Sequence, residues 1–155
     1  MDGFYGEYNV LMDEKGRISF PARLRPSYYE GAQEPDNLIL TRGLDGCLAL
    51  YPIKQWELIQ HKLGSLNFTR KDVRTFSRLL NAAAVLITLD RQGRLLIPQK
   101  LQKMASLDKE ILVIGNYRWI ELWNPQIYAQ KAEQTDRSFE DVAEGLLDID
   151  DSRKE

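Results

Sequence analysis

The pattern of apolar and polar residues predicts short β-strands in two separate parts of the chain. Residues 8–12 and 85–89 are strand-like runs, and each leads into a turn sequence. After the first turn sequence, Ile18 and Phe20 alternate with polar neighbours. This period of two places both apolar side chains on one face of a strand. Two strand pairs typical of hairpins follow later, at residues 37–42 with 46–50 and at 111–114 with 119–123.

Helices are predicted between and after these strands. Pro52 opens one helix, and Asn124 with Pro125 caps and opens its counterpart. Thr69 and Asp72 form a weak capping box before a third helix. The acidic C-terminal helix carries an apolar stripe, which we expect to pack on the protein's own core, with a contact between subunits as the alternative. This stripe consists of Phe139, Val142, Ala143, Leu146 and Leu147.

The chain contains an internal repeat. Residues 13–24 align with residues 90–101 without a gap, and Asp, Gly, Arg, Pro and Leu are identical at matching positions. Pro21 and Pro98, one such matching pair, suit the first position of a short helix. The chain is therefore a tandem of two related units. We expect a first unit at residues 5–58, a connecting helical segment at 59–81, a second unit at 82–131, and an acidic C-terminal helix and tail at 132–155.

The repeated sequence predicts a tight turn in each unit. Asp13 suits the first position of a type I turn and Gly16 the left-handed position that follows, which is the pattern of a hairpin with a glycine bulge. Asp90 and Gly93 repeat this pattern. The two aspartates need no further function, because a turn carboxylate accepts backbone N–H groups and could also pair with a nearby arginine.

An arginine directly follows the glycine of each turn, as Arg17 and Arg94. Residues 13–25 contain four basic and two acidic side chains, and residues 90–103 contain four basic and one acidic. An exposed arginine is commonly only solvated surface. Guanidinium groups nevertheless bind both phosphate and guanine well. Two arginine-tipped hairpins, one from each repeat, can together form a pseudo-twofold surface that reads DNA.

The net charge of −2 combines two regions of opposite sign. Residues 133–155 hold nine acidic and three basic residues, a net charge of −6, so residues 1–132 carry +4. A basic body permits nucleic-acid binding but does not demand it. The chain is 43% hydrophobic and has no apolar run near the ~18 residues of a membrane span. Since no secretory signal is evident either, we expect a cytoplasmic globular protein.

The residues needed for catalysis are poorly represented. His61, the only histidine, is expected to be solvated, and no second histidine or cysteine could complete a metal site with it. Cys47, the only cysteine, excludes an internal disulfide and is expected to be a small buried hydrophobic residue. The sequence contains no phosphate-binding loop, dinucleotide-binding glycine motif or zinc-protease motif. We therefore expect no enzyme activity, no cofactor and no metal.

These motifs together resemble the MraZ family of transcriptional regulators. The resemblance covers residues 5 to 147, and two turn motifs with matching flanks make it specific. It is carried by residues 13–22, 40–48 and 90–98, with Glu7, Tyr8, Tyr51, Pro52 and Trp56.

The resemblance implies a fold and a function. The fold would be a SpoVT-AbrB-like one, in which both halves supply swapped-hairpin elements to a double-split β-barrel, with helices after each unit and at the C-terminus. The protein would form ring-shaped homo-oligomers associated with the nucleoid. These rings would bind direct repeats in double-stranded promoter DNA upstream of the division and cell-wall gene cluster, usually as a repressor.

The family's DNA-contacting signature falls on Asp13 with Arg17 and on Asp90 with Arg94. One departure from a symmetric pattern is Gln102, which stands where Arg25 stands in the first unit, so the second hairpin is expected to bind less tightly or to read a different base. The expected DNA contacts are Lys15, Arg17, Arg25, Arg91 and Arg94, on turns structured by Asp13, Gly16, Asp90 and Gly93.

An antitoxin-like protein-interaction module of the same fold class is the alternative function. Its motivation is the acidic amphipathic tail, because fold relatives of this class neutralise toxins.

Overall fold

The computed structural model describes residues 3–25, 36–134 and 138–154, with side chains described up to residue 147. The chain divides into two compact units, Met1–Pro125 and Gln126–Glu155. The first unit holds both sheets, and the second holds a pair of helices at the C-terminus.

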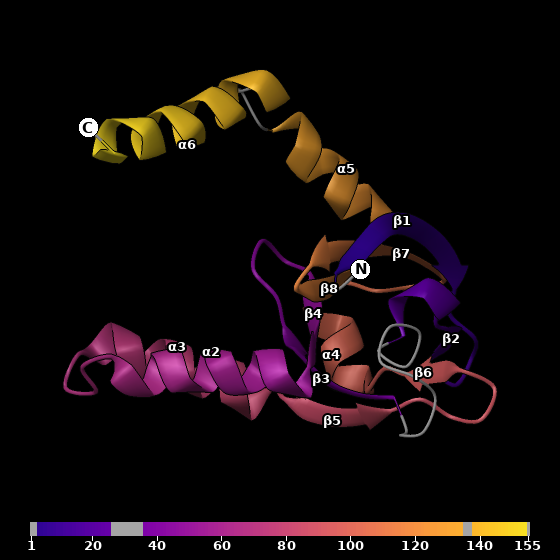
Figure 1. Cartoon of the computed structure of the whole chain (residues 1–155). Helices are drawn as coiled ribbons and strands as arrows, with labels where there is room; N and C mark the ends of the chain where they lie inside the picture. Colours follow the sequence, from indigo (N-terminus) through magenta and orange to yellow (C-terminus); the bar gives the residue numbers. More distant parts are fainter. Residues whose placement is uncertain (1–2, 26–35, 135–137, 155) are drawn as a thin grey trace. The chain divides into compact units, whose positions relative to one another are not determined.

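A six-stranded antiparallel sheet dominates the first unit, with the strand order β1-β7-β8-β4-β3-β5 (Figure 1). A separate two-stranded antiparallel ribbon pairs β2 with β6. The strands are β1 (Phe4–Leu11), β2 (Arg17–Ser19), β3 (Asn37–Arg42), β4 (Leu48–Pro52), β5 (Val85–Thr88), β6 (Arg94–Leu96), β7 (Glu110–Tyr117) and β8 (Trp119–Trp123). The strands expected from the sequence are thus confirmed, with shifts at their ends.

The two halves of the chain exchange their first strands. β1 pairs along its whole length with β7, for example Tyr8 opposite Val113. In the reverse direction β5 pairs with β3, with Leu38 opposite Ile87. The central contact between β4 and β8 joins the two hairpins. Each repeat therefore completes its sheet with a strand from the other repeat.

The helices fall where the sequence places them, with small shifts at their starts. They are the 3-10 turn η1 (Ala22–Leu24), α2 (Ile53–Ser65), α3 (Lys71–Ala82), α4 (Gln99–Met104), α5 (Pro125–Glu133) and α6 (Phe139–Lys154). Pro21 and Pro98 occupy N-cap positions and not the first helical positions expected, because ψ angles of 129° and 143° keep both residues extended.

The expected capping box before α3 is wrong. The Thr69 hydroxyl donates to Asn67 Oδ1 at 2.7 Å, and its backbone N–H donates to the same oxygen at 3.0 Å. The Asp72 carboxylate instead accepts from the Arg70 guanidinium, and the helix begins at Lys71 with no side-chain cap. Asn67 thus takes up the hydroxyl that a capping box would need.

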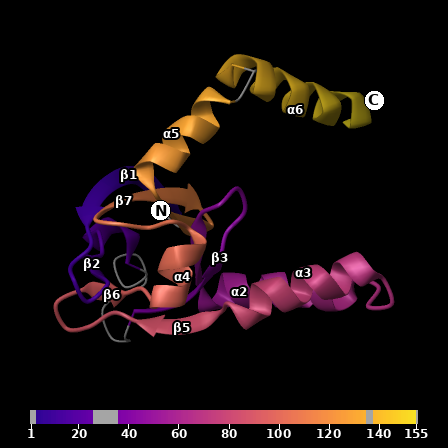
Figure 2. The same ribbon diagram turned by 180° about the vertical axis from the view of Figure 1, so that it is seen from behind.

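Equivalent residues of the two repeats build one core. Ile18 and its counterpart Leu95 are fully buried. Leu24 of η1 is also fully buried, and its counterpart Leu101 of α4 is only 2% exposed. The six-stranded sheet curves so that β1 and β7 lie on one side of α4 and β5 on the other (Figures 1 and 2). Burial of these matched pairs holds the two turn regions on a common base.

Helices α2 and α3 lie side by side and, with the connection at residues 66–70, project from the sheet as a helical arm (Figures 1 and 2). The arm is tied to β3 by the Thr41 hydroxyl, which donates to Leu80 O at 2.7 Å. Leu80 is buried in α3, whereas every residue of α2 is at least partly exposed. Large apolar side chains of the arm are exposed, namely Leu58, Leu66, Phe68, Phe76 and Leu79.

The C-terminal unit consists of α5 and α6, and its second helix is the acidic one expected from the sequence. Within α6 the apolar stripe is exposed, with Phe139 at 86% and Leu146 at 65%. The pair of helices by itself therefore provides no core for the stripe.

Candidate nucleic-acid interface

Residues 13–17 form the first arginine turn. The Gly16 backbone N–H donates to Asp13 O at 3.0 Å, and the Asp13 N–H donates to Arg17 O at 2.9 Å. Gly16 has φ of +85°, a left-handed conformation that glycine adopts without strain. These hydrogen bonds and the left-handed glycine are the features expected of the type I turn with a glycine bulge that the sequence predicts.

Residues 90–94 form the second arginine turn with the same geometry. The Gly93 N–H donates to Asp90 O at 2.9 Å, the Asp90 N–H donates to Arg94 O at 3.1 Å, and Gly93 has φ of +75°. The sequence repeat is therefore also a structural repeat at its most distinctive point.

Each turn carboxylate holds the arginine that follows it. Asp13 Oδ1 accepts from the Lys15 and Arg17 backbone N–H groups, both at 2.9 Å, while Oδ2 accepts from Arg17 Nε at 2.8 Å. Asp90 binds Arg94 in the same way, again at 2.8 Å from Nε to Oδ2. The two aspartates thus make the contacts that a turn-structuring role requires.

The same contacts lower the pKa of both carboxyl groups. For Asp13 the main cause is the backbone N–H of Arg17, which donates to the carboxylate, and the Arg17 side chain adds to it. The pKa of Asp90 is lowered chiefly by the backbone N–H of Arg94. Both aspartates are thus ionised at neutral pH and hold their arginines through charge-assisted hydrogen bonds.

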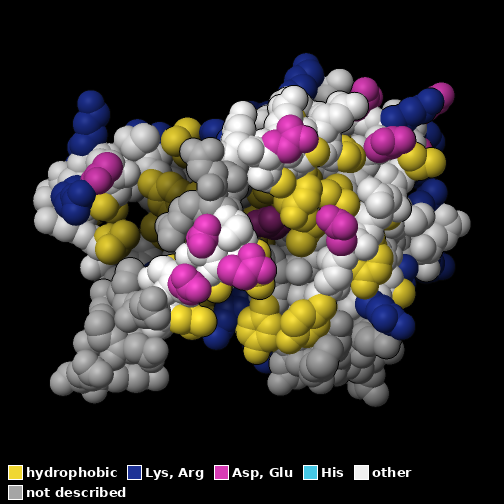
Figure 3. All heavy atoms as spheres, turned by 90° about the horizontal axis from the view of Figure 1, so that it is seen from above, with side chains coloured by type: hydrophobic (Ala, Val, Ile, Leu, Met, Phe, Trp, Pro, Cys, Tyr) yellow, Lys and Arg dark blue, Asp and Glu magenta, His cyan; other side chains and the backbone are white. Residues whose placement is uncertain are grey.

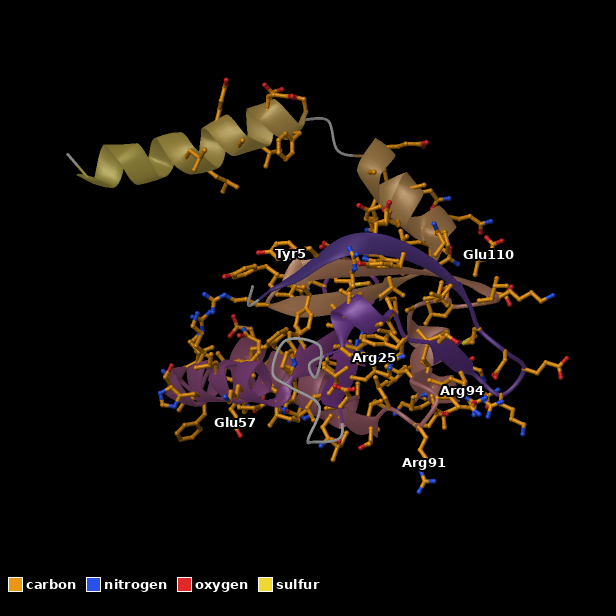
Figure 4. The ribbon with its side chains drawn as sticks, turned by 45° about the vertical axis from the view of Figure 1, so that its right-hand side comes forward. Tyr5, Arg25, Glu57, Arg91, Arg94 and Glu110 are labelled. Carbon is orange, nitrogen blue, oxygen red and sulfur yellow. The ribbon has the colours of Figure 1, made fainter. Side chains whose placement is uncertain are left out.

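These ion pairs use Nε, and among the described residues no hydrogen bond engages the Nη atoms of Arg17 or Arg94. The side chains of Arg17 and Arg94 are 29% and 31% exposed. Lys15 and Arg91 at the turn tips are exposed, and Figure 4 shows Arg91 pointing away from the body of the protein. Each turn thus presents a fixed guanidinium group at its base and a freer cation at its tip.

The ribbon β2–β6 brings the two arginines onto one face. Arg17 lies opposite Leu96 and Arg94 lies opposite Ser19, in antiparallel register. Because side chains alternate along a strand, Arg17 and Ser19 point to the same side, and Arg94 shares that side with them. Diagonal neighbours of this kind typically lie about 7–8 Å apart. The intervening pair, Ile18 with Leu95, points into the core.

Each turn also rests on the other half of the chain. The Ile97 N–H donates to Gly16 O and the Phe20 N–H donates to Gly93 O, both at 2.9 Å. Sequence reasoning missed this crossing, because periodicity does not reveal that β2 pairs with β6. Two signals pointed toward it, namely the equal spacing of Phe20 and Ile97 from their turn glycines and the swapped hairpins that the family resemblance implies.

Arg25 likewise lies at the second turn and not at the first. A Cβ atom on Gly93 would overlap the Arg25 guanidinium, whereas a Cβ on Gly16 would meet Gln102. The expectation of a weaker second hairpin assumed that Arg25 supports the turn of its own unit. That assumption is wrong, because the exchange of strands carries each side chain to the opposite turn.

The other candidate residues take the places expected of ordinary structural residues. His61 is exposed on α2. Cys47 is 4% exposed, and burial raises the pKa of its thiol to about 12. Within the described parts of the chain, no group of three or more histidine, cysteine, aspartate or glutamate side chains is arranged to hold a metal ion. None of the helices described there is long and apolar enough to cross a bilayer.

These observations define a duplicated β-sheet protein whose halves exchange strands and each present an arginine turn on a shared face. The family described as "MraZ protein, putative antitoxin-like" matches residues 4–79 and again residues 80–150. The chain belongs to the MraZ family, which confirms both the resemblance and the tandem of two units.

Two relatives from different bacteria cover nearly the whole chain. A protein of Pediococcus pentosaceus is 39% identical over 146 residues, which are 94% of this chain and 98% of the relative. A protein of Syntrophomonas wolfei is 40% identical over 147 residues, with the same two coverages. Both relatives carry the name "Transcriptional regulator MraZ".

Proposed function

We propose that this chain is a sequence-specific DNA-binding transcription regulator. It acts as a ring-shaped homo-oligomer that binds direct repeats in the promoter of the division and cell-wall gene cluster and represses it. The observation that carries the proposal is the shared face of Arg17 and Arg94 on the β2–β6 ribbon. The names of the two relatives support regulation, and the family resemblance supplies the ring, the repeats and the target cluster.

The geometry of the ribbon suits duplex DNA. A two-stranded β-ribbon fits the major groove, where a guanidinium group can bind guanine O6 and N7 with two parallel N–H donors. Asp13 and Asp90 fix the Nε side of each arginine and leave the Nη atoms for a base or a phosphate. Lys15 and Arg91 at the turn tips add contacts with the phosphate backbone.

The exchanged strands support the fold that the family resemblance implies. We interpret the sheet and ribbon as a double-split β-barrel built from two swapped-hairpin units, with boundaries at residues 5–58 and 82–131. The helical segment at 59–81 connects these units, and the acidic tail at 132–155 follows them. In this interpretation the two arginine turns are equivalent parts of one DNA-contacting head.

The helical arm supports assembly into an oligomer. Its groove is lined by Leu63, Leu66, Phe68 and Val73, and Phe68 is 76% exposed. Apolar patches of this kind on a folded protein commonly mark contacts with another protein. Figure 3 shows several separate apolar patches on the face seen from above. A ring of copies would cover such surfaces and repeat the arginine face around one axis. Nucleoid association would follow from DNA binding.

Electrophoretic mobility shift with a duplex of the promoter upstream of the chain's own gene tests the proposal. R17A and R94A should each weaken binding about tenfold or more, and the double variant should abolish it. The slope of log affinity against log salt should become shallower by about one for each phosphate that a variant no longer neutralises.

R70A is the matched control, because Arg70 forms an ion pair with Asp72 at 2.6 Å but lies outside both turns. Native mass spectrometry should give the same oligomer size for every variant. Wild-type binding by the double variant, with the oligomer intact, would exclude the arginine turns as the DNA interface.

An antitoxin-like interaction with a protein is the second candidate, favoured by the family's description and by the exposed stripe of α6. Replacing Leu146 and Leu147 with glutamate should then release the product of an adjacent toxin gene and leave DNA binding unchanged. Reduced DNA binding by this variant would instead assign α6 to the regulator itself.

A further inference from the structure

The strand exchange raises the question of what holds each arginine turn in place. The side chain nearest to a Cβ atom placed on Gly93, in the second turn, belongs to the first repeat, and the side chain nearest to a Cβ atom placed on Gly16, in the first turn, belongs to the second repeat. We propose that Arg25 is a positioning residue for the second arginine turn, that Gln102 is its counterpart for the first, and that Arg25 does not itself contact DNA. Only the last part, that Arg25 does not contact DNA, rests on the proposed function.

The Arg25 side chain packs against the backbone of the second turn. Its guanidinium lies so close to Gly93 that a Cβ atom there would overlap Cζ and both Nη atoms. Arg25 Nη2 donates to Phe20 O at 3.4 Å, and Phe20 N–H donates to Gly93 O at 2.9 Å. Arg25 therefore braces the short segment of backbone that supports the second turn.

Gln102 makes the corresponding contacts at the first turn. Its Nε2 donates to Ile97 O at 2.7 Å, and Ile97 N–H donates to Gly16 O at 2.9 Å. A Cβ atom on Gly16 would meet Gln102 Nε2. Arg25 and Gln102 occupy equivalent positions of the repeat, as do Phe20 and Ile97. Arg25 and Gln102 thus make equivalent contacts, and each side chain packs on the turn of the other repeat.

The comparison of the two braces indicates what Arg25 contributes. Glutamine is neutral, so the feature common to both positions is an N–H donor that covers the turn glycine, and not a positive charge. The environment of Arg25 agrees with this. Its Nε is buried and has no hydrogen-bond partner among the described residues, and the side chain is only partly exposed.

Hydrogen exchange followed by mass spectrometry on the full-length oligomer tests the brace without DNA. R25A should speed exchange in peptides covering residues 90–94 by about fivefold, the effect of losing one hydrogen bond, and leave residues 13–17 unchanged. Q102A should do the reverse. R25Q serves as the conservative variant and should restore most of the protection. Effects confined to the turn of the same repeat, equal effects on both turns, or none would each overturn the proposal.

Promoter binding then separates positioning from contact. If Arg25 acts through Arg94, the double variant R25A/R94A should bind no more weakly than R94A alone, and R25Q should bind within about threefold of the wild type. Additive losses, or an R25Q variant as weak as R25A, would make Arg25 a DNA contact and overturn the proposal. If the wild-type protein fails to bind the promoter, the proposed function is wrong, but the hydrogen-exchange pattern still tests whether Arg25 and Gln102 position the turns. Failure of the proposed function and failure of this proposal are therefore distinguishable.

Discussion

Alanine in place of a turn glycine should reveal how tightly each arginine turn is packed. Gly93 and Gly46 both have positive φ, at +75° and +96°, but their surroundings differ. A Cβ on Gly93 would overlap the Arg25 guanidinium, whereas nothing lies within 4 Å of a Cβ on Gly46. Gly46→Ala therefore measures the conformational term alone, and Gly93→Ala adds the displacement of Arg25.

The magnitudes follow from these two terms. An L-residue in the left-handed region costs about 1–2 kcal/mol, which is the whole effect expected for Gly46→Ala. Loss of the hydrogen bond that Arg25 makes adds about 1 kcal/mol, so Gly93→Ala should lower the free energy of unfolding by about 2–3 kcal/mol. In an R25A background the difference between the two alanine variants should largely vanish, because the three atoms closest to the added Cβ all belong to Arg25.

Chemical denaturation followed by far-ultraviolet circular dichroism is the assay. All variants are measured at one protein concentration, since association with other copies shifts the apparent stability. Equal losses for Gly93→Ala and Gly46→Ala, or a difference that persists without Arg25, would refute the reasoning about the packing of the second turn.

Three further outcomes are expected. The pKa values of Asp13 and Asp90 in the folded protein lie below the ordinary 3.8. The stability that these carboxylates supply is therefore present above pH 3.8 and is lost as the pH falls through the folded pKa. The difference in unfolding free energy between the wild type and D13N/D90N should shrink from pH 7 to about pH 3. Cys47, with a pKa of about 12, should react slowly with a thiol reagent at about pH 8 and quickly once guanidinium unfolds the protein. Fast reaction of the folded protein would contradict the burial of the Cys47 thiol. Leu95→Ala should lower the free energy of unfolding by about 2–5 kcal/mol, because the side chain is fully buried beneath the ribbon, and a loss below about 1 kcal/mol in thermal unfolding would show that the ribbon does not depend on this core.

The arginine turns could be predicted from the sequence because their determinants are local. Asp13, Gly16 and Arg17 lie within five residues, and the side chain, the left-handed glycine and the bulge all act inside that window. The same holds for the alternation of Ile18 and Phe20, which places both side chains on one face of a strand, and both are buried in the structure. Interactions among neighbouring residues were therefore enough to predict the conformation of each turn.

The relations between distant segments could not be predicted in the same way. Alternation identifies which face of a strand is buried but not which strand lies beside it, so the pairing of β2 with β6 required the structure. The position of Arg25 depends on that pairing, and alignment of the repeats placed it with the wrong turn. The starts of η1, α3 and α4 shifted for a smaller reason, since neighbouring side chains and extended prolines decide the first helical residue.

The exchange of β1 and β5 has a consequence for the integrity of the molecule. A single proteolytic nick in the connection at residues 66–70 would leave two fragments, and each would hold an edge strand that the other lacks. The fragments would stay associated, because separating them means breaking four strand pairings together, β1 with β7, β5 with β3, β4 with β8 and β2 with β6. The intact peptide link acts as a tether that keeps the two halves at high effective concentration during folding.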